Sequence, residues 1–304
     1  MIENYHRKIA NDFDKARQRE VFLQIISILK NEENELFSFD DVKSILKPKS
    51  STYKGVIPVK LSHIVGSEGR YNDFNKLFLP KSRHLRNRWE RINRAHYEDI
   101  ILPPILVYEL GGLYFVRDGN HRVSVARMQG NDFIDAEVIG LNAEIKLDPS
   151  MSMEQVKEAV IKFEKKRFLS CTKMDKYRPV EDLNFTYIGR YDDIINHING
   201  HKYYLNLDKK EEIPFKDAML SWYDNVYLPI IQLVHEEKIL SRFPGRTESD
   251  LYVWICRHWD HLKGSYGQNY PLKEAVIEYA KEYGKSVFQI IRDFFIKFLL
   301  RLRK

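Results

Sequence analysis

The run Leu113–Arg127 constrains the fold more than any other part of the sequence, because an apolar, strand-like segment changes directly into a helical pattern within it. The change falls at Asp118-Gly119, and glycine lets the backbone turn sharply and approach another group closely. The first turn of a helix points unpaired N–H groups outward from the positive end of the helix dipole. His121 and Arg122 follow at once. An imidazole and a permanent cation beside such donors predict a site for a phosphate group.

The segments on both sides of this junction have patterns typical of strands and turns. Two apolar segments flank Gly111-Gly112, a pair that favours a two-residue hairpin turn. The helix after the junction carries apolar residues on more than one side and ends at Gly130. We expect this helix to pack against a sheet with its start exposed. The predicted order is strand 105–110, turn 111–112, strand 113–117, phosphate turn, helix, and strand 134–139.

This order and these residues resemble the ParB/sulfiredoxin fold, in which a Gly-x-His-Arg or Gly-Glu-Arg-Arg turn opens the helix that holds nucleotide phosphates. The form Asp-Gly-Asn-His-Arg is similar to the Asp-Gly-His-His-Arg of the ParB-like free-serine kinases and departs from it at Asn120. The resemblance covers roughly residues 54–140, a span within the usual range for a domain. The other matching segments are the ParB-like entry strand Val56–Val65, the Arg-bearing turn Gly66–Tyr71 and the Pro-Ile-x-Val strand Leu102–Val107. The whole chain, including Phe243–Tyr252, also resembles a bacterial family of ParB-like proteins.

The resemblance implies that a glycine-rich turn, residues 66–70, faces the phosphate turn across the site. Arg70 is then placed to neutralise charge on a transferring or leaving phosphate, and Glu68 is a candidate catalytic base. The expected phosphate ligands are Gly119, Asn120, His121, Arg122 and Arg70.

Two interpretations of Asp118 remain open. Aspartate next to glycine commonly closes a turn. A carboxylate beside a triphosphate can instead hold Mg²⁺ or accept a proton from an attacking hydroxyl. The resemblance to the serine kinases, in which an acidic residue of this motif lies in the active site, favours the second interpretation.

The segment 78–97 is rich in cations around Trp89 and Ile92 and permits three interpretations. In the first and favoured interpretation, the segment is a solvated helix whose two apolar residues face the core, which is the usual outcome for a charge run. Alternatively, its arginines contact nucleic acid, or Arg83 or His84 closes over bound phosphates as a lid. The cations are Arg83, Arg86, Arg88, Arg91 and Arg94.

Composition limits the class of protein. With 304 residues, of which 43% are hydrophobic, the chain is long enough to bury a full core. The 49 basic and 43 acidic side chains give a net charge of +6, a bias too mild to decide for nucleic acid by itself. Cys171 and Cys256 form no CxxC pair, and the first residues lack the apolar core of a signal peptide. A cytoplasmic location is the simplest expectation.

The predicted fold class is α+β, with three parts. Residues 1–53 form an N-terminal extension with a long amphipathic helix over residues 3–31 and a short helix that begins at Ser38 and ends before Pro48. Residues 54–145 form the mixed, ParB/sulfiredoxin-like core. Residues 146–304 form a mainly helical region.

In that last region we expect two strands as well as helices. The strand-like runs are residues 185–188 and 201–205, separated by a short helix, 192–198, that stops at Gly200. Helices are expected at 152–168, 215–240, 251–262, 271–283 and 287–303. The last of these is too interrupted by cations to span a bilayer, and either docks on the body or binds a membrane surface or partner.

Two further motifs have functional and structural interpretations. His258 and His261 are three residues apart on a predicted helix and can supply two corners of a metal site, but two ligands do not make a site, so ordinary histidines are favoured. Phe243-Pro-Gly-Arg246, before a capped helix, is either a second anion-binding turn or a structural loop.

The sequence therefore predicts a nucleotide-binding protein that takes ATP or CTP with Mg²⁺, held through Asp118, and either hydrolyses it or transfers its phosphoryl group to a small acceptor. The alternative is a ParB-like DNA-binding module or nuclease. The first hypothesis is preferred because no helix-turn-helix is evident after the core, where ParB proteins carry theirs. The oligomeric state stays open.

Overall fold

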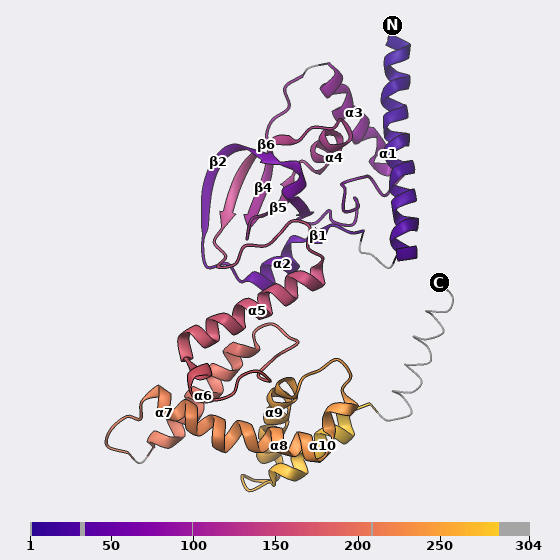
Figure 1. Cartoon of the computed structure of the whole chain (residues 1–304). Coiled ribbons are helices and arrows are strands. Elements are labelled where there is room, and N and C mark those ends of the chain that lie inside the picture. Colours follow the sequence, from indigo (N-terminus) through magenta and orange to yellow (C-terminus); the bar gives the residue numbers. More distant parts are fainter. Residues whose placement is uncertain (1, 31–33, 99, 208, 286–304) are drawn as a thin grey trace. The chain divides into compact units, whose positions relative to one another are not determined.

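A mixed sheet of six strands organises the first half of the chain, in the order β1-β3-β5-β4-β6-β2 (Figure 1). The strands are β1 (Phe37–Ser38), β2 (Ser51–Lys60), β3 (Ile64–Ser67), β4 (Ile105–Leu110), β5 (Leu113–Asp118) and β6 (Phe133–Leu141). β3 runs parallel to β1 and β5, and β4 runs parallel to β6. The pairs β4–β5 and β2–β6 are antiparallel. With helices packed on this sheet, the fold class is α+β, as predicted.

The computed structural model describes residues 2–30, 34–98, 100–207 and 209–285. The chain divides into two units, Met1–Val156 and Lys157–Lys304. The predicted boundaries after residues 53 and 145 remain predictions. Within the described residues no helix has the length and apolar character needed to cross a bilayer. The predicted helix 287–303 lies outside the described residues.

The hairpin β4–β5 forms at the predicted glycine pair. Gly111 and Gly112 both have positive φ, 63° and 87°, the backbone conformation that a type I′ turn requires. Leu110 pairs with Leu113 directly across the turn. The hairpin places the C-terminal end of β5 beside the beginning of β4. The predicted phosphate turn follows β5 directly.

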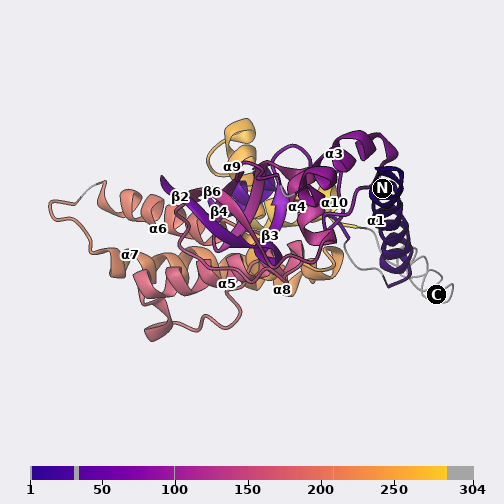
Figure 2. The same ribbon diagram turned by 90° about the horizontal axis from the view of Figure 1, so that it is seen from above.

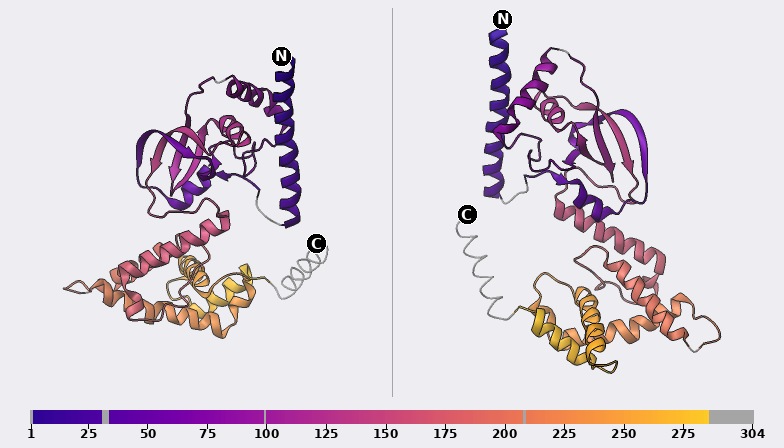
Figure 3. Two further views of the ribbon diagram at one scale, coloured as in Figure 1. Left: turned by 45° about the horizontal axis from the view of Figure 1, so that its top comes forward. Right: turned by 180° about the vertical axis from the view of Figure 1, so that it is seen from behind.

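Helix α4 (Asn120–Met128) lies between the sheet and two other helices, α1 (Ile2–Lys30) and α3 (Arg86–Tyr97). Val123 and Ala126 belong to the hydrophobic cluster of the sheet, whereas Val125 belongs to a cluster with Phe13 and Trp89. The sheet, α4, α3 and α1 follow one another in space (Figures 2 and 3). The prediction that this helix has apolar contacts on more than one side is confirmed.

A buried arginine fastens α4 to the connection between β2 and β3. The Arg127 guanidinium donates hydrogen bonds to the carbonyl oxygens of Leu61 (2.6 Å), Ile64 (2.8 Å) and Lys76 (3.3 Å). Burial lowers its pKa to about 10. Its role is therefore structural: it satisfies backbone carbonyls at the end of the helix.

The opposite face of the sheet carries α2 (Phe39–Leu46), which begins where β1 ends. Ser38 caps this helix by accepting a hydrogen bond from the Asp41 N–H, as its sequence predicts. The Phe39 ring stacks on Tyr108 with centroids 4.4 Å apart and contacts Phe115 at 5.7 Å.

The two edges of the sheet are short or irregular. β1 has only two residues. β2 contains Pro58 and has a register shift between Tyr53 and Gly55 in its pairing with β6. Each edge therefore offers little regular, unpaired backbone.

The second unit is helical. Its helices are α5 (Met153–Thr172, which begins in the first unit), α6 (Arg190–Asn206), α7 (Phe215–Trp222), α8 (Leu228–Glu236), α9 (Glu248–Tyr266) and α10 (Leu272–Tyr283). One hydrophobic cluster, with Trp222 and Tyr252 at its centre, gathers side chains from all of them. Between α7 and α8 the chain forms a π-helical turn over residues 223–227. Pro229 explains this interruption, because it has no N–H for the carbonyl of Asn225.

The predicted strands 185–188 and 201–205 are wrong. Residues 201–205 lie inside α6, which runs through Gly200. Residues 185–188 form a bend whose Thr186 N–H is accepted by Asp250 rather than by a neighbouring strand. Tyr203 and Tyr204 are exposed on α6, so they do not form the half-buried face of a strand. The helix is held by the packing of Ile194 and Ile198 earlier in α6, which outweighs the local preference of these residues for strands.

We expect Gly119→Ala to lower the free energy of unfolding by about 2–4 kcal/mol. Gly119 has φ of 108°, and a Cβ atom there would lie 2.4 Å from the Ile105 Cγ2. The backbone conformation costs about 1–2 kcal/mol for an L-residue, and overpacking adds about 1–3 kcal/mol. The measurement is urea denaturation followed by circular dichroism.

Gly130→Ala is the matched control, because Gly130 has φ of 78° but a Cβ atom there would meet no other atom within 4 Å. This control carries the conformational cost alone, about 1–2 kcal/mol. Equal losses in the two variants would show that the Ile105 contact does not require a glycine at residue 119.

Candidate anion-binding site

The two predicted turns follow the C-terminal ends of neighbouring strands in the sheet. β3 and β5 are parallel neighbours in which Ser67 pairs with Val116, so the residues after each strand emerge side by side. The Glu68 N–H donates to the Val116 carbonyl at 2.9 Å, continuing the pairing into the first turn. Residues 66–70 therefore lie next to Asp118-Gly119, as the resemblance implies.

Gly119 is the N-cap of α4, and no side chain caps the helix there. The first hydrogen bond of the helix runs from the Val123 N–H to the Gly119 carbonyl at 3.0 Å. The N–H groups of residues 120–122 are therefore not used within the helix. They are the donors that the sequence predicts for an anion.

The start of this helix is buried, contrary to the prediction that it is exposed. Asn120 and His121 are each only 5% exposed. The Phe74 ring packs edge-on against the His121 ring, with centroids 5.3 Å apart. Within the described part of the chain, the Asn120 Oδ1 and the His121 Nδ1 have no hydrogen-bond partner. Two buried polar atoms thus lie at the predicted phosphate turn without the partners that such atoms normally have.

Cations surround His121. Burial, followed by the charges of Arg88 and Arg70, lowers the pKa of His121 from 6.5 to about 4; Arg91 lowers it further, and Asp73 opposes the shift. The imidazole is therefore neutral at pH 7. Positive charge from three guanidinium groups converges on this buried ring, and that is the electrostatic pattern of an anion site.

Two of these arginines belong to the basic segment 78–97 but are not among the predicted phosphate ligands. Arg88 and Arg91 are exposed and lie three residues apart on α3, so they share one helix face. Neither forms an ion pair within the described residues. Arg83 and His84, the residues selected as a lid, are exposed just before α3, and the His84 Nδ1 lies 2.6 Å from the Ser82 Oγ. The sequence shows a run of arginines around Trp89 but does not indicate which of them approach His121.

Arg122 and Asp118 form an ion pair with each other. The Arg122 guanidinium also donates to the carbonyls of Pro103 and Pro104, the second at 2.9 Å, and the side chain is 13% exposed. Arg122 therefore holds β5 against the segment before β4, and it lines a pocket of about 260 Å³ there. Asp118 is 61% exposed and keeps its second oxygen accessible to a ligand.

Glu68 and Arg70, the predicted residues of the turn 66–70, are also in ion pairs. Glu68 lies 3.7 Å from the Arg117 Nε, and Arg70 donates to Asp73 at 3.0 Å. Both pairs are largely exposed, so they contribute little to stability and can exchange partners. A phosphate can therefore recruit Arg70 without breaking a buried interaction.

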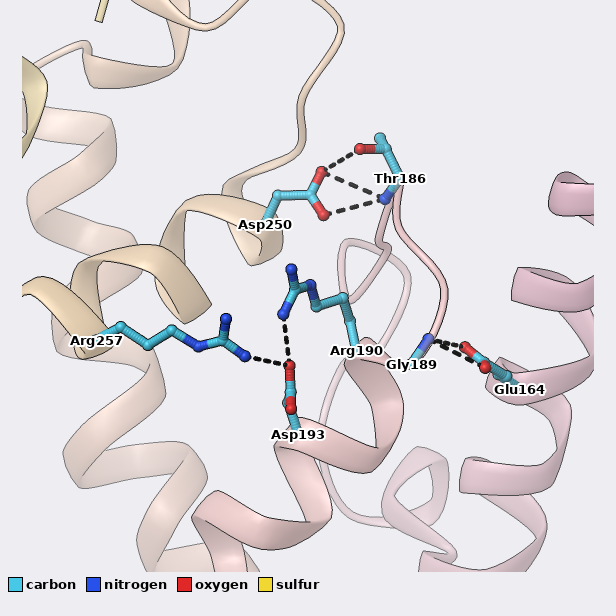
Figure 4. A network of polar contacts seen from close by, with 7 residues as sticks. All are labelled: Glu164, Thr186, Gly189, Arg190, Asp193, Asp250 and Arg257. Atoms are coloured by element: carbon cyan, nitrogen blue, oxygen red, sulfur yellow. Dashed lines mark hydrogen bonds and ion pairs between the residues drawn. The ribbon is translucent and has the colours of Figure 1, made fainter. Parts of the chain in front are cut away.

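The second motif, Phe243–Tyr252, has a structural role. Asp250 accepts the N–H group of Thr186 (Figure 4). It also accepts the N–H group of Thr247, whose side chain caps α9 in return. The Arg246 guanidinium lies 4.3 Å from the centre of the Tyr187 ring. The helix start is thus already occupied by its own carboxylate, which supports the structural loop rather than a second anion site.

The same unit contains another carboxylate that caps a helix. Both carboxylate oxygens of Glu164 accept the Gly189 N–H, at 2.8 and 3.0 Å, at the beginning of α6 (Figure 4). In the next turn Asp193 accepts hydrogen bonds from Arg190 and Arg257. These buried or half-buried acids have complete sets of partners and are explained by the fold.

We expect the stability of the protein to fall between pH 6.5 and pH 4 because of His121. The unfolded histidine takes a proton near pH 6.5, whereas the folded one does so only near pH 4. Stability from this group is complete above pH 6.5 and is lost as pH falls, by up to about 3 kcal/mol. The measurement is the free energy of unfolding in urea at a series of pH values.

The control is His121→Gln, which cannot titrate but keeps a polar side chain of similar length. Its stability curve should be flatter than that of the wild type over this range, while His197, whose pKa burial also lowers, contributes equally to both. Parallel curves for the two proteins would show that His121 titrates normally.

Comparisons with known proteins give limited information. No protein-family model and no curated protein matches the chain. Two solved structures are similar to it, both of the N domain of a pNOB8-like ParB protein. The first, in crystal form C2221, is 14% identical, with 73% of this chain and 87% of that chain covered and a TM-score of 0.22. The second is 14% identical, with 73% and 82% covered and a TM-score of 0.21. Likeness at this level establishes neither family nor activity.

Proposed function

We propose that the two neighbouring turns, residues 66–70 and 118–122, bind the phosphate groups of a nucleoside triphosphate. One observation carries this proposal: the unused N–H groups at the start of α4 lie beside a buried, neutral His121, whose pKa is lowered by the charges of Arg88, Arg70 and Arg91 and raised by that of Asp73. An anion beside the ring would neutralise this charge. It would also accept hydrogen bonds from the unused N–H groups at the start of α4.

The energetic cost of the unliganded arrangement supports the same conclusion. Buried polar atoms without partners cost about 1–3 kcal/mol each. The Asn120 Oδ1 and the His121 Nδ1 both have this status within the described residues. A ligand that carries donors as well as phosphate oxygens, such as a nucleotide, can satisfy an acceptor that a bare phosphate cannot.

Entry of the ligand requires a local movement. Gly119, Asn120 and His121 are buried, and Phe74 lies against the His121 ring. We therefore propose that the segment around Phe74 moves away from the helix start when the triphosphate binds. The ligand binds this open state preferentially and shifts the population towards it.

The exposed acid of the turn gives the site a chemical role. Asp118 is exposed and directly precedes the proposed phosphate turn, so we infer that it would hold Mg²⁺, which proteins bind through one or two carboxylates together with phosphate oxygens. The bound ion would neutralise charge on the phosphoryl group. Arg70 is in an exposed, exchangeable pair with Asp73 and would do the same from the other turn. The proposed reaction is hydrolysis of the triphosphate or transfer of its phosphoryl group to a small acceptor.

We expect ATP or CTP with Mg²⁺ to raise the melting temperature, and the double variant Arg88→Ala/Arg91→Ala to bind it at least tenfold more weakly. Charge-assisted contacts to phosphate contribute about 1.5–3 kcal/mol, which corresponds to about 10-fold to 150-fold in affinity. The measurements are thermal shift with ATP, ADP, CTP, GTP and inorganic triphosphate, followed by calorimetric titration.

Arg7→Ala is the matched control, because Arg7 is exposed on α1 and lies far along the chain from the site. It should bind the nucleotide as the wild type does. Equal affinity in the double variant and in this control would remove the α3 arginines from the site. A shift with inorganic triphosphate equal to that with every nucleotide would limit the proposal to phosphate recognition.

Asp118→Asn should retain nucleotide binding but lower turnover at least about 100-fold, because a carboxamide neither holds Mg²⁺ well nor accepts the proton. The measurements are phosphate release and phosphoryl transfer under saturating nucleotide, with the melting temperature as a check of folding. Full turnover in this variant would exclude Asp118 from the reaction. Tight binding without turnover in the wild type would make the protein a nucleotide-dependent switch.

A second candidate function is a ParB-like DNA-binding module or nuclease. Its supporting observation is the row of exposed arginines before and along α3, namely Arg83, Arg88 and Arg91. Phosphate contacts by such a row would make affinity for a DNA duplex fall steeply with salt. Stabilisation by a short duplex at low salt, lost at high salt and absent with nucleotides, would favour this function over the first.

A further inference from the structure

A histidine and two glutamates from neighbouring helices come together in the second unit. His258 lies on α9, and Glu278 and Glu282 lie one turn apart on α10. One potential ligand atom from each residue can be chosen so that all three lie within 4.8 Å of one another. Three such atoms are the number of protein ligands in many metal sites that keep a position open.

The surrounding packing holds the imidazole in place. The His258 ring contacts the ring of Tyr279 at 5.7 Å and that of Tyr283 at 5.8 Å, both on α10. Val276 and Ala280 of the same helix are buried in the hydrophobic cluster. The relative positions of α9 and α10, and therefore of the three side chains, are fixed by this contact.

Among the residues that the structure describes, one nitrogen of this cluster lacks a hydrogen-bond partner, and the two carboxylates lack a cationic partner. The His258 Nε2 is buried and has no hydrogen-bond partner within the described residues. Glu278 and Glu282 are like charges at i and i+4, an arrangement that destabilises a helix. Neither carboxylate forms an ion pair within the part of the chain that the structure describes. A cation here would give the buried imidazole nitrogen a partner and would relieve the repulsion between the two carboxylates.

One carboxylate is also oriented by a second residue. The Tyr270 hydroxyl donates to the Glu278 Oε2 at 2.7 Å, and this bond raises the pKa of Tyr270 to about 12. Hydrogen bonds of this kind orient ligands in metal sites and leave the other carboxylate oxygen for the ion.

We propose that His258, Glu278 and Glu282 bind a divalent transition-metal cation. An imidazole nitrogen with two carboxylates suits Zn²⁺ and its first-row neighbours, whereas Ca²⁺ and Mg²⁺ prefer oxygen ligands alone. The ligand pair is not the one that sequence spacing suggests: His261 is exposed, and the partners of His258 come from α10 instead. The site lies in the helical unit and is independent of the proposed nucleotide function.

The test is a calorimetric titration of the untagged, metal-free full-length protein with Zn²⁺ alone, and with Co²⁺ followed by visible absorption. We expect one equivalent to bind, with the absorption bands of a low-coordinate Co²⁺ ion. Glu278→Gln, Glu282→Gln and His258→Gln should each weaken binding at least tenfold.

Glu274→Gln and His261→Gln are the matched controls, since each makes the same change one helical turn or less from a proposed ligand on the same helix. Both should bind as the wild type does. Glu282 is exposed, so Glu282→Gln tests the site without disturbing the core, and circular dichroism verifies its fold. Wild-type affinity in Glu278→Gln and Glu282→Gln, loss of affinity in the controls, or no binding at all would overturn the proposal.

Discussion

The contact between the Gly119 backbone and the Ile105 side chain determines how β5 passes into α4. A side chain at residue 119 would have to occupy the position of an Ile105 methyl group and adopt a conformation that L-residues rarely take. The turn can therefore be this tight only with glycine. Because the helix begins at once, Arg122 reaches back to Asp118, and the buried Val123 faces the sheet. The glycine is thus explained by the fold, before any ligand is considered.

The same turn combines features that stabilise the fold with features that do not. Apolar packing on both sides of α4 and the hydrogen bonds of Arg127 fix the helix firmly. At its first turn, however, Asn120 and His121 bury polar atoms without partners, and guanidinium charges gather around them. Local conflicts of this kind are most often found where a protein binds something, because the ligand completes the interactions. The contrast with Asp250, an equally buried acid whose partners are all supplied by its own unit, makes the difference clear.

The parts of the fold that follow from sequence are those governed by short-range chemistry. The Gly111-Gly112 hairpin and the caps at Ser38 and Thr247 depend on residues at most a few positions apart, and all three form as expected. The wrong strand at 201–205 arises because tyrosine and leucine occur in strands and helices alike. Tyr203 and Tyr204 are in fact exposed, and α6 is held by the packing of Ile194 and Ile198, which precede them. Gly200, taken as a helix end, is simply accommodated within α6.

The site shows the same division. The resemblance implies that the two turns are adjacent. In the structure their adjacency follows from β3 and β5 being parallel neighbours. Among the arginines that lower the pKa of His121, Arg70 is predicted from the resemblance, whereas Arg88 and Arg91 could not be assigned from the sequence, because their position depends on how α3 is fixed to α4. That attachment is a tertiary contact, the hydrogen bond from the Trp89 indole to the Ser124 hydroxyl at 2.9 Å. No local pattern encodes it.

The irregular borders of the sheet also restrict how this protein can associate with others. A two-residue β1 on one side, and the bulge and proline of β2 on the other, leave no long, straight row of free amides and carbonyls for a foreign strand. Recruitment of an extended peptide, or growth of a continuous sheet across several copies, is disfavoured at both borders. Assembly with a partner would have to use helical surfaces or loops.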